Sequence, residues 1–350
     1  MRKTITIAAL LVLASCTSGQ MAQIEDDFSS VVNLDDCSVI EVSDYIERVA
    51  VRGNYVVFKV LSKEQQACVM DISNDGKQYF LARGRGPGET TNLLDISFYD
   101  GHTVQASVDP ESVMLFDVDS LMNGKTAPEF VYKLADGHNA FPNIVKLPNS
   151  VLYCGKNIGE SSNSTNYCIE EVGSGSIRGF GTYPDDEITN SIPSNDYSLQ
   201  TAYQAKIRTS PDNKRAVAYY FYILGFDILD TEKAKVASSR IYSPLGAKVT
   251  QNEILKASFV TRNPDAMRGF LDVAVTERYI YLLSSLKRFS EESYDKGRDV
   301  YRFSWDGRPD KHFQLKFTTG SIAVSSDDKV LYAIKNETDH DALVKYAINN

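Results

Sequence analysis

The sequence predicts an all-β fold, a six-bladed β-propeller of four-stranded antiparallel blades closed by an N-terminal strand. Three observations predict it. Short apolar or aromatic strands, separated by tight polar turns, recur in groups about every 40 to 50 residues. No long stretch carries the periodicity of an amphipathic helix. A lone strand precedes the first group and the last group has only three strands, so pairing of the two ends would leave no open sheet edge.

Six groups of strands account for most of the chain. They cover residues 47–82, 94–134, 143–182, 205–242, 271–316 and 321–347. Residues 30–35 form the lone strand ahead of them, and residues 251–258 are predicted to form at most one short helix. A chain of 350 residues is long enough for two ordinary domains, but the repeated strands favour one large domain.

The composition is globular and acidic. Hydrophobic residues make up 43% of the chain, and 20 Tyr and 16 Phe against one Trp favour strands. The formal net charge is −9, and no segment carries a basic stripe. These features argue against nucleic acid as a partner and against electrostatic attachment to anionic lipid.

The N-terminus has the pattern of an export signal. Arg2 and Lys3 precede an apolar run at residues 5–13 that is too short to span a bilayer as a helix. The run ends in Leu-Ala-Ser-Cys, which resembles a bacterial lipobox. The resemblance implies cleavage before Cys16 and diacylglycerol on the Cys16 sulfur. An ordinary signal peptide with an incidental cysteine is the alternative.

This pattern predicts three parts of the chain. They are a lipoprotein signal peptide at residues 1–15, a flexible tether at 16–28 and a single propeller domain at 29–350. The protein would be attached to the membrane by its lipid anchor only. We expect an outer-membrane lipoprotein, in the periplasmic leaflet or on the cell surface, with the choice of leaflet open.

Four further cysteines follow the lipobox: Cys37, Cys68, Cys154 and Cys168. An exported compartment permits disulfides, and Cys154 and Cys168 lie on adjacent predicted strands, so they are the candidate pair. Free buried thiols are the alternative, because cysteine also serves as a small core residue.

A glycine-dense loop lies between the first and second groups of strands. Its sequence from residue 81 is Leu-Ala-Arg-Gly-Arg-Gly-Pro-Gly-Glu. Glycines leave backbone amides uncovered, so the loop is a candidate anion-binding nest. The ligand-binding candidates are Arg83, Arg85, Gly86, Gly88 and Glu89. The alternative is a tight crossing between strands whose arginines pair with nearby acids.

The long connections are predicted to share one face of the ring. They are residues 157–166, 183–203, 243–269 and 286–298. Alternating strands place the links between second and third strands, and the links between blades, on one side, here called the long-loop face. The tight turns lie on the other side, the short-turn face. Long ordered loops tend to carry function, so the long-loop face is the candidate binding surface.

Polar residues open the innermost predicted strands and would converge on the central channel. They are Asp95, Asn143, Gln204, Asp272 and Ser321. Carboxylate and amide oxygens suit Ca²⁺ or Mg²⁺, which makes Asp95, Asn143 and Asp272 candidate metal ligands. The arrangement is similar to the metal site of lactonase-type six-bladed propellers, which use such residues to polarise an ester. A hydrated polar channel rim is the alternative.

The chain as a whole resembles a known family. The resemblance rests on the lipobox leader, the Gly-Arg-Gly-Pro-Gly-Glu loop, the Trp-Asp-Gly turn at residues 305–307 and the last blade beginning Ser-Ile-Ala-Val at 321–324. Together these resemble the TolB-like six-bladed propeller lipoproteins of Bacteroides and relatives. The resemblance implies the fold and the cellular address more than an activity.

Two functions remain open at this stage. The first is a non-enzymatic binding or scaffolding module that holds a protein or cell-envelope ligand on the long-loop face. The second is a metal-dependent hydrolase of the lactonase type that uses the channel residues. No Gly-x-Ser-x-Gly elbow is present and no histidine is placed by sequence to serve a nucleophilic serine, so nucleophilic catalysis has no support.

Overall fold

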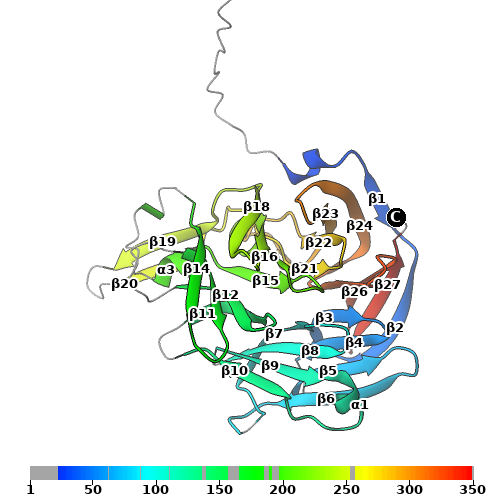
Figure 1. Cartoon of the computed structure of the whole chain (residues 1–350). Coiled ribbons are helices and arrows are strands. Elements are labelled where there is room, and N and C mark those ends of the chain that lie inside the picture. Colours follow the sequence, from blue (N-terminus) through cyan, green and yellow to red (C-terminus); the bar gives the residue numbers. More distant parts are fainter. Residues whose placement is uncertain are drawn as a thin grey trace, which may run out of the picture.

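The computed structural model describes residues 23–61, 63–86, 88–109, 111–135, 139–156, 165–184, 189–190, 197–252 and 257–348. It is a ring of six antiparallel blades (Figure 1), which confirms the predicted fold. The first strands of neighbouring blades contact one another, which places them around the central channel. Cys16 lies outside the described residues.

The blades follow one another in chain order. Blade 1 holds β3 (Ile46–Arg52), β4 (Tyr55–Val60), β5 (Gln65–Asp71) and β6 (Gly76–Ala82). Blade 2 holds β7 (Asn92–Phe98), β8 (Thr103–Asp109), β9 (Ser112–Asp117) and β10 (Phe130–Lys133). Blade 3 holds β11 (Asn139–Lys146), β12 (Ser150–Lys156), β13 (Thr165–Glu171) and β14 (Ile177–Thr182). Blade 4 holds β15 (Ala205–Thr209), β16 (Arg215–Tyr220), β17 (Gly225–Asp230) and β18 (Lys235–Ile241).

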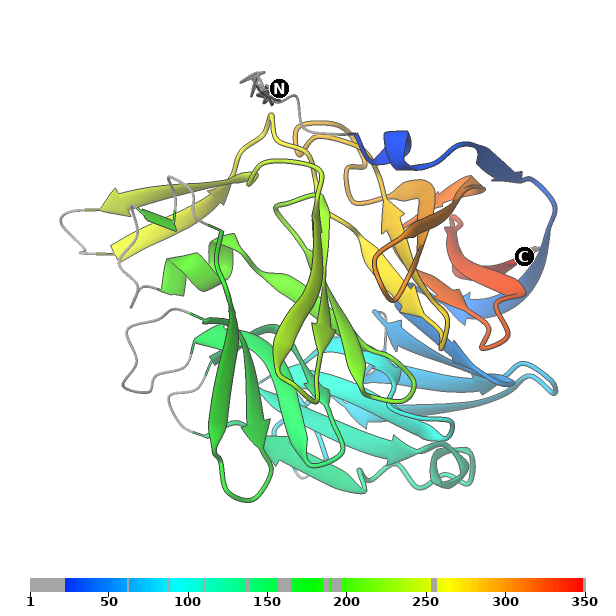
Figure 2. The same ribbon diagram turned by 45° about the horizontal axis from the view of Figure 1, so that its top comes forward.

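The last two blades recruit the N-terminal strands. Blade 5 holds β21 (Asp272–Val275), β22 (Tyr279–Ser284), β23 (Gly297–Ser304) and β24 (Pro309–Thr319). Blade 6 holds β25 (Ile322–Val324), β26 (Val330–Asn336) and β27 (Asp341–Ala347), and β2 (Cys37–Asp44) pairs antiparallel with β27 as its fourth strand. Figure 2 shows the blue N-terminal strands beside the red C-terminal blade. Closure by an N-terminal strand is therefore confirmed.

The strand that closes the ring is not the lone strand predicted at residues 30–35. The lone strand is β1 (Val31–Leu34), which pairs in parallel with β24 and adds a fifth strand to blade 5. The closing strand β2 comes directly after it. Two consecutive N-terminal strands thus tie blades 5 and 6 together.

The sequence allowed at most one short helix at residues 251–258, and the described ends of that segment are strands instead. Residues 253–256 lie outside the described part. The segments before and after them, β19 (Ala247–Asn252) and β20 (Ala257–Arg262), pair as antiparallel strands. Val and Thr in both segments favour strand pairing over a helix. Among the elements whose bounds lie in the described residues are two short α-helices, α1 (Val118–Met122) and α3 (Tyr197–Ala202). The α1 helix lengthens the β9–β10 connection, an exception among the tight turns of the short-turn face.

The segment before β1 is folded against the ring. The 3₁₀ helix η1 (Ile24–Asp27) buries Ile24 to 1% exposure, and the Tyr242 hydroxyl donates to Asp27 Oδ2 at 2.6 Å. The Phe28 ring lies 5.2 Å from the Tyr301 ring, centroid to centroid. Residues 24–28 of the predicted tether are therefore folded against the ring, because an apolar side chain anchors them between blades 4 and 5.

The predicted Cys154–Cys168 disulfide does not form. Cys154 lies opposite Tyr167 and Cys168 lies opposite Tyr153 in the β12–β13 pair. Because side chains alternate between the two faces along a strand, this register sends the two thiols to opposite faces of the blade. Both thiols are buried and free, and Cys37 and Cys68 are free as well. The buried-thiol alternative is the correct one.

Candidate functional site

The glycine-dense loop between β6 and β7 folds around its own glutamate. Glu89 Oε2 accepts a hydrogen bond from the Gly86 N–H at 2.7 Å, and the Glu89 N–H donates to the Gly86 carbonyl at 3.0 Å. A Cβ at Gly84 would lie 1.9 Å from Glu89 Oε2, so the fold-back of this carboxylate requires glycine there. The predicted anion nest is therefore occupied by the chain's own carboxylate.

The other loop candidates differ in what they contact. Arg83 and Arg85 are both exposed. Arg83 Nη1 donates to the Thr91 carbonyl at 3.1 Å, whereas Arg85 has no hydrogen bond or ion pair within the described part of the chain. Gly88 turns the backbone with a φ of 77°. The loop thus presents one unengaged guanidinium, that of Arg85, on a backbone braced by Glu89.

The first polar cluster of the channel centres on Asp95 of β7. Asp95 is 2% exposed, and Arg208 of β15 donates to its two oxygens at 2.5 and 2.9 Å. Asn143 of β11 donates to Asp95 Oδ2 at 3.2 Å and also bonds both backbone groups of Ile207. Burial pushes the pKa of Asp95 upward, but the positive charges of Arg208, Lys206 and Arg48 outweigh burial and lower it.

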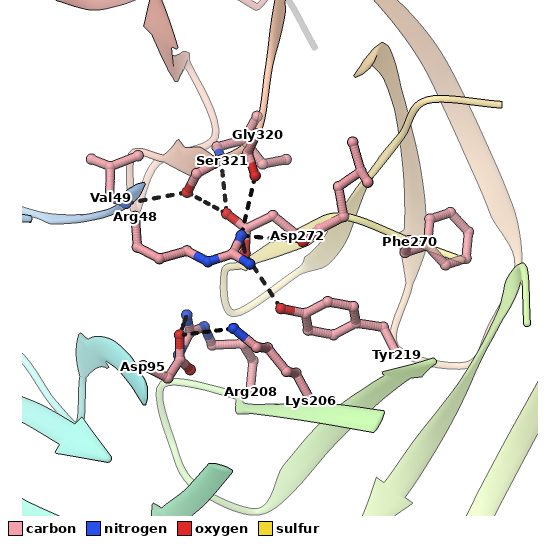
Figure 3. A network of polar contacts seen from close by, with 12 residues as sticks. Arg48, Val49, Asp95, Lys206, Arg208, Tyr219, Phe270, Asp272, Gly320 and Ser321 are labelled. Carbon is pink, nitrogen blue, oxygen red and sulfur yellow. Dashed lines mark hydrogen bonds and ion pairs between the residues drawn. The ribbon is translucent and has the colours of Figure 1, made fainter. Parts of the chain in front are cut away.

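The second cluster centres on Asp272, the first residue of β21 (Figure 3). Asp272 is 1% exposed, and Arg48 Nη1 of β3 lies 3.4 Å from its Oδ1. The Tyr219 hydroxyl donates to the same oxygen at 3.4 Å. Asp272 Oδ2 accepts from the Ser321 hydroxyl and from the Ile322 N–H. Asp272 thus joins blades 1, 4, 5 and 6 at the channel.

The proposed metal ligands are brought to the channel, but their oxygens are engaged by protein donors. Asp95 and Asn143 touch, as their positions on the innermost strands predict. The carboxylate of Asp95 faces the Arg208 guanidinium and that of Asp272 faces Arg48, so each acid meets a cation of the chain. Among the described residues, no group of three or more His, Cys, Asp or Glu is placed to hold a metal. This donor set fits arginine better than Ca²⁺ or Mg²⁺.

Two further cations at the channel lack a dedicated acid. Lys206 Nζ lies 4.0 Å from Asp95 Oδ1, a carboxylate already held by Arg208. Arg268 is 7% exposed, and its Nη1 donates to the carbonyls of Phe221 and Phe270 at 2.8 and 3.3 Å. Within the described residues Arg268 has no ion pair. Burial, together with the charge of Arg48, lowers the pKa of Lys206 to about 8 and that of Arg268 to about 10.

These cations line two adjoining cavities. A cavity of about 220 Å³ is bordered by Arg48, Lys206, Arg268, Tyr219 and Phe270, and one of about 340 Å³ also includes Arg48 and Arg268. The innermost strands begin at the long-loop face, and Arg48, Lys206 and Asp272 lie at the starts of theirs. Both cavities therefore belong to the long-loop end of the channel.

Sequence reasoning found the acids of this site and missed its cations, Arg48, Lys206, Arg208 and Arg268. A signal was present in the Lys-Ile-Arg of residues 206–208, where two charges flank a buried residue on an innermost strand. Residues two apart on a strand share a face, so this pattern places two cations on one side. Arg268 precedes its strand and carried no such signal.

In the described part of the chain, no helix has both the length and the apolar character needed to cross a bilayer.

Comparison with solved structures finds other propellers at low identity. A member of the DUF4221 family from Bacteroides vulgatus has a TM-score of 0.50 at 10% identity, covering 91% of this chain and 95% of that one. The WD40 repeats of RRP9 have a TM-score of 0.49 at 8% identity, covering 91% and 99%. The Cps50 (Swd1) β-propeller domain of Myceliophteria thermophila has a TM-score of 0.47 at 10% identity, covering 90% and 100%. At such identities the likeness concerns the fold alone.

Sequence comparison is more specific. No curated protein shows a match to the chain. Residues 58–327, however, match the family described as TolB-like 6-blade propeller-like, and that span runs from the first blade to the start of the last. The chain therefore belongs to the TolB-like six-bladed propeller family.

Proposed function

We propose that this protein is a non-enzymatic binding module, exported and lipid-anchored through Cys16, that holds a protein or cell-envelope ligand on its long-loop face. One observation carries the proposal. The two channel carboxylates that would serve metal or acid–base chemistry, Asp95 and Asp272, are each held by an arginine, while the cations left over border cavities at the long-loop end.

The glycine-dense loop supports the same face. It joins blades 1 and 2 on the long-loop side, and Glu89 holds its backbone in place. Arg85 is exposed there and has no partner in the described part of the chain. A guanidinium on a braced loop can bind a carboxylate or phosphate of a partner with little loss of conformational entropy.

The cellular address is part of the proposal and rests on the leader sequence. The folded arm begins at Ile24, and six residues lie between Cys16 and the first described residue, Gln23, which makes seven Cα–Cα steps. A chain of that length spans at most about 25 Å when fully extended. The propeller would therefore lie close to the outer membrane in which its lipid is inserted. Its ligand would be found in that membrane or directly beside it.

The binding test uses the soluble form from residue 23 and an envelope fraction from the native bacterium. Photo-crosslinking from the long-loop face identifies the ligand, and its affinity is then measured for wild type and Arg85→Ala. We expect Arg85→Ala to weaken binding about fivefold or more, as interface arginines do, with an unchanged melting temperature. Lys329→Ala, an exposed cation on the short-turn face, is the matched control. Equal capture by wild type and Arg85→Ala would remove this loop from the interface.

A second arm tests the absence of metal-dependent chemistry. The soluble protein is melted with EDTA and then with excess Ca²⁺ or Mg²⁺. A ligand at a hundredfold its Kd stabilises the folded state by about 2.7 kcal/mol. We expect no shift, because Arg208, Arg48 and Ser321 already engage the carboxylates. A rise in melting temperature that Asp95→Asn abolishes would replace the binding proposal with the hydrolase.

A further inference from the structure

We propose that the long-loop end of the channel binds a small organic dianion with an apolar or aromatic body, held by Lys206 and Arg268 beside Arg48. The inference rests on the proposed function as a binding module and names a ligand class for it. Phosphate monoesters and dicarboxylates share this chemistry, and the experiment below separates them.

The charges at the channel do not balance. Within the described residues, four cations (Arg48, Lys206, Arg208 and Arg268) meet two buried carboxylates there (Asp95 and Asp272). The two arginine–aspartate pairs consume both acids and leave Lys206 and Arg268. Lys206 then shares the Asp95 carboxylate with Arg208, and buried Arg268 has no ion pair within the described residues. A largely desolvated cation without a carboxylate of its own is costly to fold, so the excess marks a place where an external anion completes the arrangement.

Other acids near the cavities do not cancel this excess. Glu47 lines the larger cavity, but its carboxylate pairs with Lys59 at 2.7 Å. Asp295 and Lys296 line the same cavity with opposite charges, and Asp295 is exposed, so water screens its charge. Neither acid borders the smaller cavity, where Lys206 lies. The two surplus charges match a ligand of charge −2.

Donors that lack an acceptor point to the same place. The Nε atoms of Arg48 and Arg268 are buried and have no hydrogen-bond partner. Both arginines border both cavities. A buried N–H without a partner costs about 1–3 kcal/mol, and an oxygen of a bound anion would satisfy it. An unliganded site with these donors is incomplete.

The residues that line the smaller cavity indicate what the uncharged part of the ligand is. Phe221, Phe270 and Leu271 line one side, across from Lys206 and Arg48. The Arg268 guanidinium stacks 3.8 Å from the centre of the Phe221 ring, which keeps its plane fixed. Apolar walls with a few placed charges are the usual form of a small-molecule site. The anionic groups would contact Lys206 and Arg268, and the body of the ligand would pack on Phe270 and Leu271.

The probes are phenyl phosphate and phthalate, each an aromatic ring with an anionic substituent, measured by calorimetry on the soluble form from residue 23. Inorganic phosphate tests charge without a body, and benzyl alcohol tests a body without charge. We expect at least one aromatic anion to bind at least about tenfold more tightly than either control, because only an aromatic anion supplies both the charge for Lys206 and Arg268 and the body that packs on Phe270 and Leu271. Which aromatic anion binds more tightly separates phosphate from carboxylate ligands.

Lys206→Met and Arg268→Met test the two residues. Each variant should bind the preferred probe about tenfold or more weakly. Arg268→Met also removes hydrogen bonds to the Phe221 and Phe270 carbonyls, so its stability is not diagnostic. Lys206→Met should be as stable as wild type without ligand, or more so, because the one ion pair of Lys206 is with a carboxylate that Arg208 already holds. A purely structural role predicts the opposite, a loss of stability. Lys329→Met, an exposed cation on the short-turn face, is the control that leaves probe binding unchanged. If Arg268→Met does not fold, Lys206→Met decides.

Two results would overturn the proposal: no binding of either aromatic anion to wild type at millimolar concentration, or wild-type affinity in both methionine variants. These failures are distinct from failure of the proposed function. Capture of an envelope ligand that depends on Arg85 would stand without probe binding, and then only the ligand class is wrong. If the probe binds in a way that depends on Lys206 but no envelope ligand is captured through Arg85, the protein is a receptor for small molecules and the proposed function is wrong.

Discussion

The guanidinium of Arg208 donates two hydrogen bonds to the carboxylate of Asp95, across 113 positions of sequence. Both side chains are nearly buried, at 10% and 3% exposure. The pair links the innermost strands of blades 2 and 4, and Asn143 of blade 3 completes it. The channel is therefore held by charges from non-adjacent blades, and the first two predictions below concern charges at this channel.

Breaking the Arg208–Asp95 pair should be costly. Arg208→Met leaves a buried carboxylate without its cation, and we expect the free energy of unfolding to fall by about 3–5 kcal/mol in urea denaturation. Replacing both partners, Asp95→Leu with Arg208→Met, should recover much of the loss, because no charge then stays buried. The exposed Arg85→Met should change stability by less than about 0.5 kcal/mol. A loss for Arg208→Met as small as that control would show that the pair is solvated.

Stability should rise with pH where Lys206 titrates. Its folded pKa of about 8 lies below the value of about 10.4 for an unfolded lysine. Between these values the unfolded chain binds more protons than the folded protein, so the free energy of unfolding increases with pH. We expect the stability gap between Lys206→Met and wild type to narrow from pH 7 to about 9.5, below the range where tyrosines ionise. A constant gap over that range would contradict the assignment.

The thiols should react in two classes. Cys68, Cys154 and Cys168 are at most 1% exposed, and burial raises the pKa of Cys68 and of Cys168 to about 12. The thiolate is the reactive form, so these three should react with a disulfide reagent only after unfolding. Half-buried Cys37 should react in the folded protein, and Cys37→Ser should remove that phase. If the soluble form, unfolded without a reducing agent, shows fewer than four reactive thiols, a disulfide is present and the assignment of four free thiols is wrong.

The N-terminal arm should contribute to stability. Ile24 packs among blade 4 and blade 5 residues at 1% exposure, so Ile24→Ala should lower the free energy of unfolding by about 2 kcal/mol or more. Glu25→Ala, one residue on and exposed, is the matched control. Equal stability of Ile24→Ala and wild type would mean that the arm detaches and that the tether extends to residue 28 after all.

Much of the fold and part of the site followed from local patterns. The six groups of strands, the tight turns and the convergence of Asp95, Asn143 and Asp272 on the channel could be predicted, because alternation and turn chemistry are read from neighbouring residues. The hairpin whose described ends lie within 251–258 was not predicted, since a short, mostly polar segment has no strong local preference and strand pairing decided it.

The sequence by itself determined an all-β ring closed by its own N-terminus, with polar residues at the channel and long loops on one face. Only the tertiary structure decided which cation meets which acid, that Glu89 occupies the nest of its own loop, and that Cys154 and Cys168 face opposite ways. The physical reason is that each of these depends on strand register or on blades distant in sequence. Charge pairing acts over a few ångströms in space, and the ring brings Arg208 to Asp95 while leaving Lys206 and Arg268 without an acid of their own.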